Sequence, residues 1–168
     1  MTYSELLLFL RQHSYQEIPQ INQSGDFHVL GDTIFWWPVT RPSRVRSHFF
    51  GEELEFQEEE GGLGWRRISE SLDLVANEVE TEHGTIHPGE YLVHPHHGVG
   101  IFERVLTKPD IDSLTRTYVS LQYAGNDRLL FPWDRRVELM PYIGSRHPRL
   151  TRLYSKSWEK TKDKWPKI

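Results

Sequence analysis

The feature that most constrains the fold of this chain is a series of short alternating runs between residues 89 and 133. Val119, Leu121 and Tyr123, for example, are apolar positions separated by more polar ones, and residues 129–133 repeat the pattern. Alternation with a period of two is typical of half-buried β-strands. About four or five such strands in so short a stretch predict a small, strongly bent β-barrel.

The residues between these runs have the chemistry of tight turns. Gly98 and Gly100 permit a positive φ or a close backbone approach, and Gly125 with Asn126 suits a hairpin connection. Pro132 has no N–H to donate to a ladder, which favours the end of a strand or a sheet edge. The segment therefore reads as consecutive strands joined by hairpins.

Four short motifs follow one another in this segment: Gly-Glu-Tyr-Leu-Val-His at 89–94, His-Gly-Val-Gly at 97–100, Tyr-Val-Ser-Leu-Gln-Tyr at 118–123 and Asp-Arg-Leu-Leu-Phe-Pro at 127–132. In their order and spacing these motifs resemble the RNA-polymerase-interacting module shared by CarD-type regulators and the bacterial transcription-repair coupling factor. The resemblance runs to about residue 144, and it implies a Tudor/SH3-like barrel that binds the β subunit of RNA polymerase by pairing an edge strand with it.

We expect the polymerase-binding edge to be the strand around residues 101–108. An exposed strand offers unpaired backbone N–H and C=O groups to a partner strand, and its alternate side chains give specificity. The alternative is that this strand lies inside the barrel. The residues expected to bind the polymerase are Ile101, Glu103, Arg104, Val105, Leu106, Thr107 and Lys108.

The N-terminal residues 1–76 predict a separate α+β domain. Thr2 and Glu5 have the spacing of a capping box, so residues 3–13 are expected to form an amphipathic helix. An antiparallel meander should follow, with one more strand returning within residues 69–76. The four meander strands are expected at 27–30, 33–37, 44–50 and 53–57, and residues 77–87 are expected to be a linker to a second domain at 88–144.

The motifs of this first domain include Gly25-Asp26-Phe27, Leu30-Gly31-Asp32 and Phe49-Phe50-Gly51-Glu52-Glu53. They are similar to those of the UvrB-like domain of the coupling factor, the surface by which that factor and UvrB contact UvrA. The resemblance implies UvrA contacts at Arg46 and Phe50, although Arg46 could equally be an ordinary exposed strand residue. The chain departs from the family at Leu30, where a basic residue usually stands.

Charge is distributed unevenly along the chain. Residues 52–60 contain six glutamates, which we expect to form a solvated face or a linker before Gly61 and Gly62. Residues 145–168 carry a net charge of +6 against −4 for the whole chain, and they are expected to form a basic helix. That helix is either a solvated face or a nucleic-acid contact. The candidate nucleic-acid-binding residues are Arg149, Arg152, Lys156, Trp158 and Lys160.

No catalytic motif supports an enzyme. The sequence has no phosphate loop, no Gly-x-Ser-x-Gly elbow and no His-Glu-x-x-His pair. A cluster of imidazoles at His87, His94, His96 and His97 could suggest a metal, but no cysteine joins it, so neither a metal nor a cofactor is expected. The chain has no cysteine and no long apolar run near its start, so we expect a cytoplasmic protein without a membrane segment.

The sequence thus predicts a mainly β chain of the α+β class, with a UvrB-like domain, a small barrel and a short C-terminal helix. The first functional hypothesis is a non-catalytic adaptor that binds the RNA polymerase β subunit and has UvrA as a further partner. The second is a CarD-like regulator that binds nucleic acid, because small bent barrels and basic tails do so. The third is that the chain is a piece of a longer coupling factor.

Overall fold

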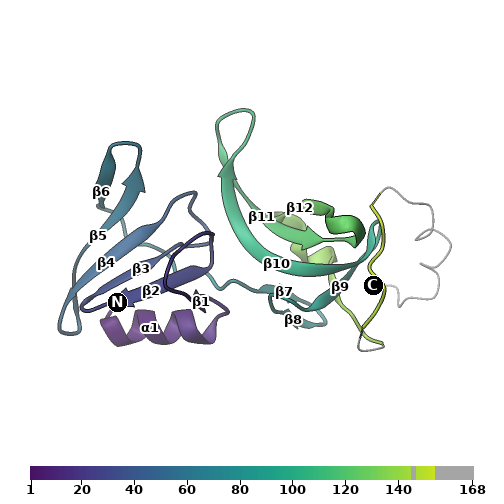
Figure 1. Ribbon diagram of the computed structural model, residues 1–168, viewed down its shortest axis with the longest axis horizontal. Coiled ribbons are helices and arrows are strands. Elements are labelled where there is room, and N and C mark those ends of the chain that lie inside the picture. The colour runs from purple at the N-terminus through teal and green to yellow at the C-terminus, as the bar shows by residue number, and fades with distance from the viewer. Residues whose placement is uncertain (145–146, 154–168) are drawn as a thin grey trace. The chain divides into compact units, whose positions relative to one another are not determined.

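The computed structural model describes residues 1–144 and 147–153, and the chain divides into two compact units (Figure 1). The N-terminal unit contains residues 1–77 together with residues 105–117. The C-terminal unit contains residues 78–104 and the chain from residue 118 onward. The segment 105–117 therefore belongs, by its contacts, with the beginning of the chain.

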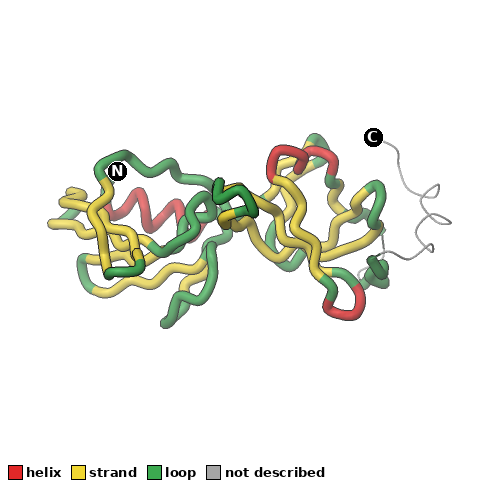
Figure 2. Tube along the Cα trace, turned by 90° about the horizontal axis from the view of Figure 1, so that it is seen from above, coloured by secondary structure: helices red, strands yellow, loops and turns green. Residues whose placement is uncertain are grey.

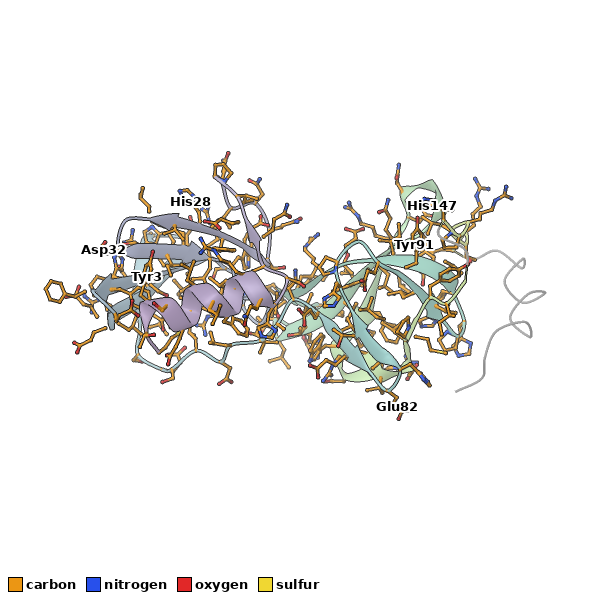
Figure 3. All side chains as sticks on the ribbon, turned by 90° about the horizontal axis from the view of Figure 1, so that it is seen from below. Tyr3, His28, Asp32, Glu82, Tyr91 and His147 are labelled. Atoms are coloured by element: carbon orange, nitrogen blue, oxygen red, sulfur yellow. The ribbon has the colours of Figure 1, made fainter. Side chains whose placement is uncertain are left out.

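One helix and a six-stranded sheet make up most of the N-terminal unit. Helix α1 (Tyr3–Gln12) begins at Thr2, whose side chain accepts the Glu5 N–H while the Glu5 carboxylate accepts the Thr2 N–H, so the predicted capping box is confirmed. The helix lies along the sheet (Figures 1 and 3). The sheet has the order β1-β2-β3-β4-β5-β6, with strands β1 (Gln16–Glu17), β2 (Asp26–Leu30), β3 (Thr33–Trp36), β4 (Val45–Phe50), β5 (Glu53–Gly61) and β6 (Gly64–Ile68).

The core of this unit lies between α1 and one face of the sheet. Burial alternates along β4, because Val45, Ser47 and Phe49 are buried while the residues between them are partly exposed. The buried Ser47 hydroxyl accepts hydrogen bonds from Trp36 Nε1 at 3.0 Å and Gln57 Nε2 at 2.8 Å. These bonds satisfy the polar atoms that β3, β4 and β5 bring into the core, as a buried polar group requires.

The second half of the N-terminal sheet differs from the sequence prediction. The glutamate-rich stretch is part of the long strand β5, and Gly61 and Gly64 close a hairpin to β6, a strand that was not predicted. The strand expected within residues 69–76 is absent there, where the chain has no regular structure. The glutamates lie in a strand because arginines face them: Arg41 and Arg66 pair with Glu59, and Arg44 with Glu60.

The expected linker at residues 77–87 contains a small hairpin of its own. Strand β7 (Val79–Thr81) pairs antiparallel with β8 (Gly84–Ile86), and Val79 and Ile86 are completely buried. Thr81 Oγ1 donates to the Gly84 carbonyl at 2.8 Å and closes the turn. This part of the chain is therefore a folded element of the C-terminal unit rather than an extended connector.

The second large sheet has five strands in the order β12-β11-β10-β9-β13. Figure 2 shows its long central strands in yellow. Within residues 1–144 and 147–153 the order is open at β12 and at β13, so the predicted closed barrel is not confirmed, whereas antiparallel strands are. The elements are β9 (Tyr91–His94), β10 (Gly98–Pro109), β11 (Thr115–Gln122), η1 (Ala124–Asn126), β12 (Arg128–Pro132), η2 (Trp133–Glu138) and β13 (Met140–Pro141).

The basic segment after β13 is described over residues 147–153 alone, and those residues are not helical. Thr151 joins this segment to the sheet: its N–H donates to the Val99 carbonyl at 2.9 Å and its Oγ1 accepts the Val99 N–H at 2.9 Å. The predicted helix over 145–168 is therefore wrong for residues 147–153, and its remainder lies outside the described residues. No described helix has the length and apolar character needed to span a membrane.

Candidate functional site

Strand β10, which contains the residues expected to bind the polymerase, is not an edge strand. The sheet order places it between β11 and β9. Strand β9 pairs with it from Gly98 to Ile101, and Phe102 continues the contact by donating to the Glu90 carbonyl at 3.0 Å and accepting the Gly89 N–H at 2.8 Å. The alternative that the strand is internal is therefore correct over this half, and the prediction of an exposed edge is wrong there.

Beyond Phe102 the β10 backbone is bonded by side chains from the beginning of the chain. The Val105 N–H donates to Asn77 Oδ1 at 2.9 Å, and the Val105 carbonyl accepts from Ser24 Oγ at 2.7 Å. All three residues are buried and belong to the N-terminal unit. The main-chain groups beside Val105, which the sequence analysis expected to be unpaired, are therefore satisfied within the chain.

Thr107 adds a third contact, in which a side chain of β10 bonds a backbone carbonyl of the N-terminal unit. Its Oγ1 lies 2.7 Å from the Val39 carbonyl and 2.8 Å from Thr117 Oγ1 on the neighbouring strand β11. We call Ser24, Val39 and Asn77 the edge cap, because these three residues bond the end of β10. Asn77 is itself fixed, since its Nδ2 donates to the Ser14 carbonyl at 3.2 Å.

The seven side chains expected to bind the polymerase differ in accessibility. Val105 is 0% exposed and Thr107 is 8% exposed, so neither side chain is available to a partner in this conformation. Glu103 accepts from Arg128 Nε at 2.9 Å. Lys108 is exposed, and the partly exposed residues are Ile101, Glu103, Arg104 and Leu106.

The turn that follows β10 carries an apolar surface that the sequence analysis did not single out. Ile111 is fully exposed and Leu114 is 62% exposed. Arg116 holds the turn, because its guanidinium donates to Asp110 Oδ2 at 2.8 Å and to Asp112 Oδ2 at 2.6 Å. Two apolar residues within an otherwise polar turn were the signal that could have found this surface.

The histidine cluster has a structural role at the β9–β10 turn. His94 is buried, and its Nδ1 accepts the N–H groups of His96 at 2.9 Å and His97 at 3.1 Å. Burial, followed by the nearby His97 and His96, lowers the pKa of His94 from 6.5 to about 4. Among residues 1–144 and 147–153, no three His, Cys, Asp or Glu side chains are grouped so as to hold a metal ion.

The residues expected to contact UvrA lie on β4. Arg46 donates to Glu58 Oε1 at 3.2 Å, and its guanidinium carbon stands 4.3 Å from the centre of the Trp65 ring. The hydrogen bond from Arg46 lowers the pKa of Glu58. Phe50 ends the strand and is 75% exposed. Arg46 is therefore engaged within its own sheet, whereas Phe50 is open to solvent.

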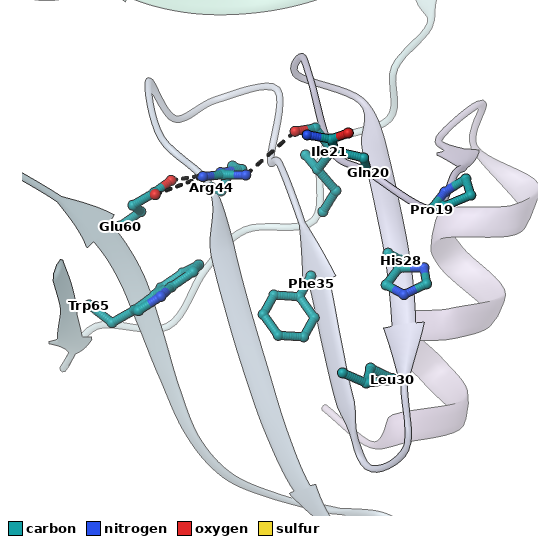
Figure 4. A pocket seen from close by; sticks show the side chains of 9 residues that line it. All are labelled: Pro19, Gln20, Ile21, His28, Leu30, Phe35, Arg44, Glu60 and Trp65. Carbon is teal, nitrogen blue, oxygen red and sulfur yellow. Dashed lines mark hydrogen bonds and ion pairs between the residues drawn. The ribbon is translucent and has the colours of Figure 1, made fainter.

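A pocket of about 360 Å³ lies on the same sheet (Figure 4). Phe35 and Trp65 meet edge to face in its wall, with ring centres 6.2 Å apart. Arg44 closes one side through its ion pair with Glu60 at 2.6 Å. Leu30, the position at which a basic residue was expected, contributes an apolar side chain to the lining. The full lining is Pro19, Gln20, Ile21, His28, Leu30, Phe35, Arg44, Glu60 and Trp65.

The structure describes only two of the five candidate nucleic-acid-binding residues. Arg149 and Arg152 are exposed. Lys156, Trp158 and Lys160 lie outside the described residues, so the structure does not bring the five together.

Comparison with known proteins finds similarity over one part of the chain. Over 78 residues, the chain is 40% identical to the transcription-repair-coupling factor of Staphylococcus aureus (strain MRSA252) and 41% identical to that of Staphylococcus epidermidis (strain RP62A). The corresponding factor of Staphylococcus haemolyticus is 40% identical over the same length. Each alignment covers 45% of this chain and 7% of the relative, so the chain spans a small part of the relatives it matches. Residues 86–143, which contain β9 to β13, match the CarD-like/TRCF RID domain.

Proposed function

We propose that this protein is a non-catalytic adaptor that binds the β subunit of bacterial RNA polymerase through the outer part of β10. The observation that carries this proposal is the match of residues 86–143 to the CarD-like/TRCF RID domain. The 40% identity to transcription-repair-coupling factors supports a role in coupling transcription to repair.

The geometry of β10 supports residues 103–108 as the docking segment. Among the described residues, β9 pairs with residues 98–101 of β10, and the strand continues to Pro109. Beyond Phe102, β11 is the neighbouring strand, and the bonds from the edge cap come from two side chains and one carbonyl. Such an end can pair with one further strand whose main-chain groups replace the bonds from the edge cap, because main-chain pairing does not require specific side chains.

The charged side chains of this segment would select the partner. Lys108 is exposed, and Glu103 and Arg104 stand 3.7 Å apart as an ion pair at the start of the segment. Charges at the rim of an interface govern the association rate and its salt dependence more than the final affinity. A partner strand with an acidic residue opposite Lys108 fits this arrangement.

Affinity capture of purified RNA polymerase tests the proposal, and two matched substitutions locate the contact. Lys108→Glu reverses a charge on the docking segment, and Arg149→Glu makes the same charge change at an exposed position outside it. We expect Lys108→Glu to weaken binding several-fold and Arg149→Glu to leave it unchanged. Absence of any polymerase binding by the wild-type chain would refute the proposal, and equal loss in both variants would refute the location.

UvrA is the second proposed partner, at Phe50 and Arg46. A phenylalanine that is 75% exposed at the end of a strand supports a protein contact at this position. We expect Phe50→Ala to abolish capture of purified UvrA while leaving polymerase capture intact, whereas Leu63→Ala, at another exposed apolar residue, leaves both intact. Capture of UvrA by the Phe50→Ala variant at wild-type strength would contradict this contact.

A nucleic-acid contact is the alternative proposal, and exposed Arg149 and Arg152 support it. Phosphate contacts make binding strongly dependent on salt, so a DNA titration at two salt concentrations distinguishes this function from protein binding. We expect DNA affinity to fall steeply with salt and to drop further in Arg149→Glu.

A further inference from the structure

We infer that the chain regulates its own docking segment: the edge cap occupies the strand edge at which the polymerase would pair, and the cap must open before docking. This inference rests on the proposed polymerase binding, and it adds a closed and an open state of the same site. The contacts that define the closed state all lie within the N-terminal unit, to which residues 105–117 belong.

The cap satisfies the backbone of β10 in the way that a neighbouring strand would. Asn77 Oδ1 takes the place of a strand carbonyl opposite the Val105 N–H, and Ser24 Oγ takes the place of a strand amide opposite the Val105 carbonyl. Two residues further on, Thr107 Oγ1 bonds the Val39 carbonyl. A partner strand that paired with Val105 through the same two groups would have to displace Asn77, because one N–H donates one strong hydrogen bond. Ser24 Oγ occupies the position from which a strand amide would donate to the Val105 carbonyl.

The groups that bond Val105 are shielded from bulk solvent. Val105 is 0% exposed, Asn77 4%, Ser24 5% and Thr107 8%. Gly25 gives Asn77 the room it needs: a Cβ at Gly25 would stand 2.6 Å from Asn77 Nδ2. The side chain of Asn77 is thus packed against a position that has no side chain, and its amide is held facing β10.

The bonds of the cap can be exchanged for those of a strand at small net cost. An intramolecular hydrogen bond contributes only a modest net free energy, because its groups otherwise bond water or another partner. A strand that pairs with several residues of β10 offers more such bonds than the three that the cap supplies. The cap therefore does not prevent polymerase binding. It lowers the apparent affinity for the polymerase in proportion to the fraction of molecules in which the cap is open.

The sequence supports a dedicated role for these residues. Ser24 and Asn77 lie 81 and 28 residues before Val105, so neither contact follows from local hairpin geometry. A free strand edge also invites pairing with a second copy of the same chain, and covering that edge prevents it. The same contact would thus keep the chain from self-pairing and hold it closed until a polymerase strand competes for the edge.

The test removes side chains of the edge cap and leaves the residues of the docking segment unchanged. Ser24→Ala with Asn77→Ala removes both side chains that bond Val105. Ser71→Ala with Asn22→Ala makes the same two changes at exposed positions and is the matched control. Ser24→Ala alone is the milder variant, which keeps the experiment interpretable if the double variant does not fold by circular dichroism.

Two readouts separate this inference from the proposed function. In titrations with purified RNA polymerase, we expect the open variant to bind roughly tenfold more tightly than the wild type, and Ser24→Ala to lie between them. In amide hydrogen exchange of the free chains, we expect the Val105 amide to be protected in the wild type and the control and to exchange faster in the open variant.

Each outcome decides one of the two ideas. If the wild type and both cap variants bind polymerase with equal affinity, the closed state is overturned and the proposed polymerase binding stands. Weaker polymerase binding by a folded Ser24→Ala variant overturns the closed state as well. Rapid exchange of Val105 in the wild-type chain also overturns the closed state, whatever the polymerase does. If no variant binds polymerase, the proposed function fails and its regulation fails with it.

Discussion

Asn77 Oδ1 accepts the backbone N–H of Val105 at 2.9 Å, and this contact joins the last residue of the segment 1–77 to the first residue of the segment 105–117. Its partner contact, from Ser24 Oγ to the Val105 carbonyl, is 2.7 Å long. Together they make the end of β10 part of the N-terminal unit. The segment that we propose as the docking surface therefore contains the contacts that join it to residues 1–77.

Ser24→Ala should destabilise the chain. The substitution leaves the Val105 carbonyl buried without its hydrogen-bond donor, and an unsatisfied buried group costs about 1–3 kcal/mol. We expect a free energy of unfolding lower by about that amount in urea denaturation, with an unchanged m-value. Ser71→Ala, at an exposed serine, should stay within about 0.5 kcal/mol of the wild type. Equal stability of the two variants would show that the Ser24 bond contributes nothing.

Gly100→Ala should disrupt the C-terminal sheet. A Cβ at Gly100 would lie 3.0 Å from Tyr123 Cζ and 3.1 Å from the Gln122 carbonyl oxygen, and the buried Tyr123 ring has no room to move away. Such overpacking costs typically about 1–3 kcal/mol. The control is Gly62→Ala, where a Cβ meets nothing within 4 Å. A thermal melt in which Gly100→Ala and Gly62→Ala coincide would refute the close approach.

His94→Asn should remove a pH dependence of stability. The pKa of His94 is lowered by burial to about 4 from 6.5, so between these values the unfolded chain binds more protons than the folded one. Stability contributed by neutral His94 is therefore lost as the pH falls from about 6.5 to about 4. Asparagine keeps an acceptor oxygen near the position of Nδ1 and does not titrate.

The measurement is the free energy of unfolding at several pH values across that window. We expect a shallower slope in His94→Asn than in the wild type, whereas His83→Asn, at an exposed histidine, keeps the wild-type slope. Identical slopes in all three proteins would contradict the burial of a neutral His94.

Arg46→Met should raise the pKa of the Glu58 carboxyl. The hydrogen bond from Arg46 is the main cause of the lowered pKa of Glu58, and methionine keeps much of the side-chain volume without the charge. A carbon-detected NMR titration of the glutamate carboxyls follows this directly. Arg44→Met is the matched control, because Arg44 pairs with Glu60 and should shift that carboxyl instead. A Glu58 titration unaffected by Arg46→Met would show that the ion pair does not persist in solution.

Local sequence signals predicted helices and strands well where one capping motif or one hydrophobic period was enough to determine the element. The Thr2 and Glu5 pair predicted the beginning of α1 correctly, and Val119 and Leu121 are buried as their shared face predicted. The alternation along β11 is incomplete, because Ser120 between them is buried as well. Strand β6 was missed because Trp65 to Ile68 lacks clear alternation and follows two glycines, which indicated a loop. In the sequence, the glutamates of β5 form a run of like charges. In the structure, Arg41 and Arg66 pair with Glu59 and Arg44 pairs with Glu60.

The edge of β10 could not have been predicted from periodicity. An alternating pattern gives the two faces of a strand, and it contains no information about which edges other groups will occupy. Ser24 and Asn77 have no local signal, because their role depends on a contact formed across 81 and 28 residues of sequence. The resemblance of residues 89 to about 144 could be recognised because four motifs in fixed order carry family information that single residues do not, and the family match over residues 86–143 covers all four.

Hydrogen exchange of the full chain with and without purified RNA polymerase tests the polymerase-binding strand most directly. If the polymerase pairs with the end of β10, amides within residues 103–108 should exchange more slowly in the complex, while those of β6 keep their free rates. Polymerase binding that leaves residues 103–108 unchanged, or protects another segment in their place, would contradict docking at this strand.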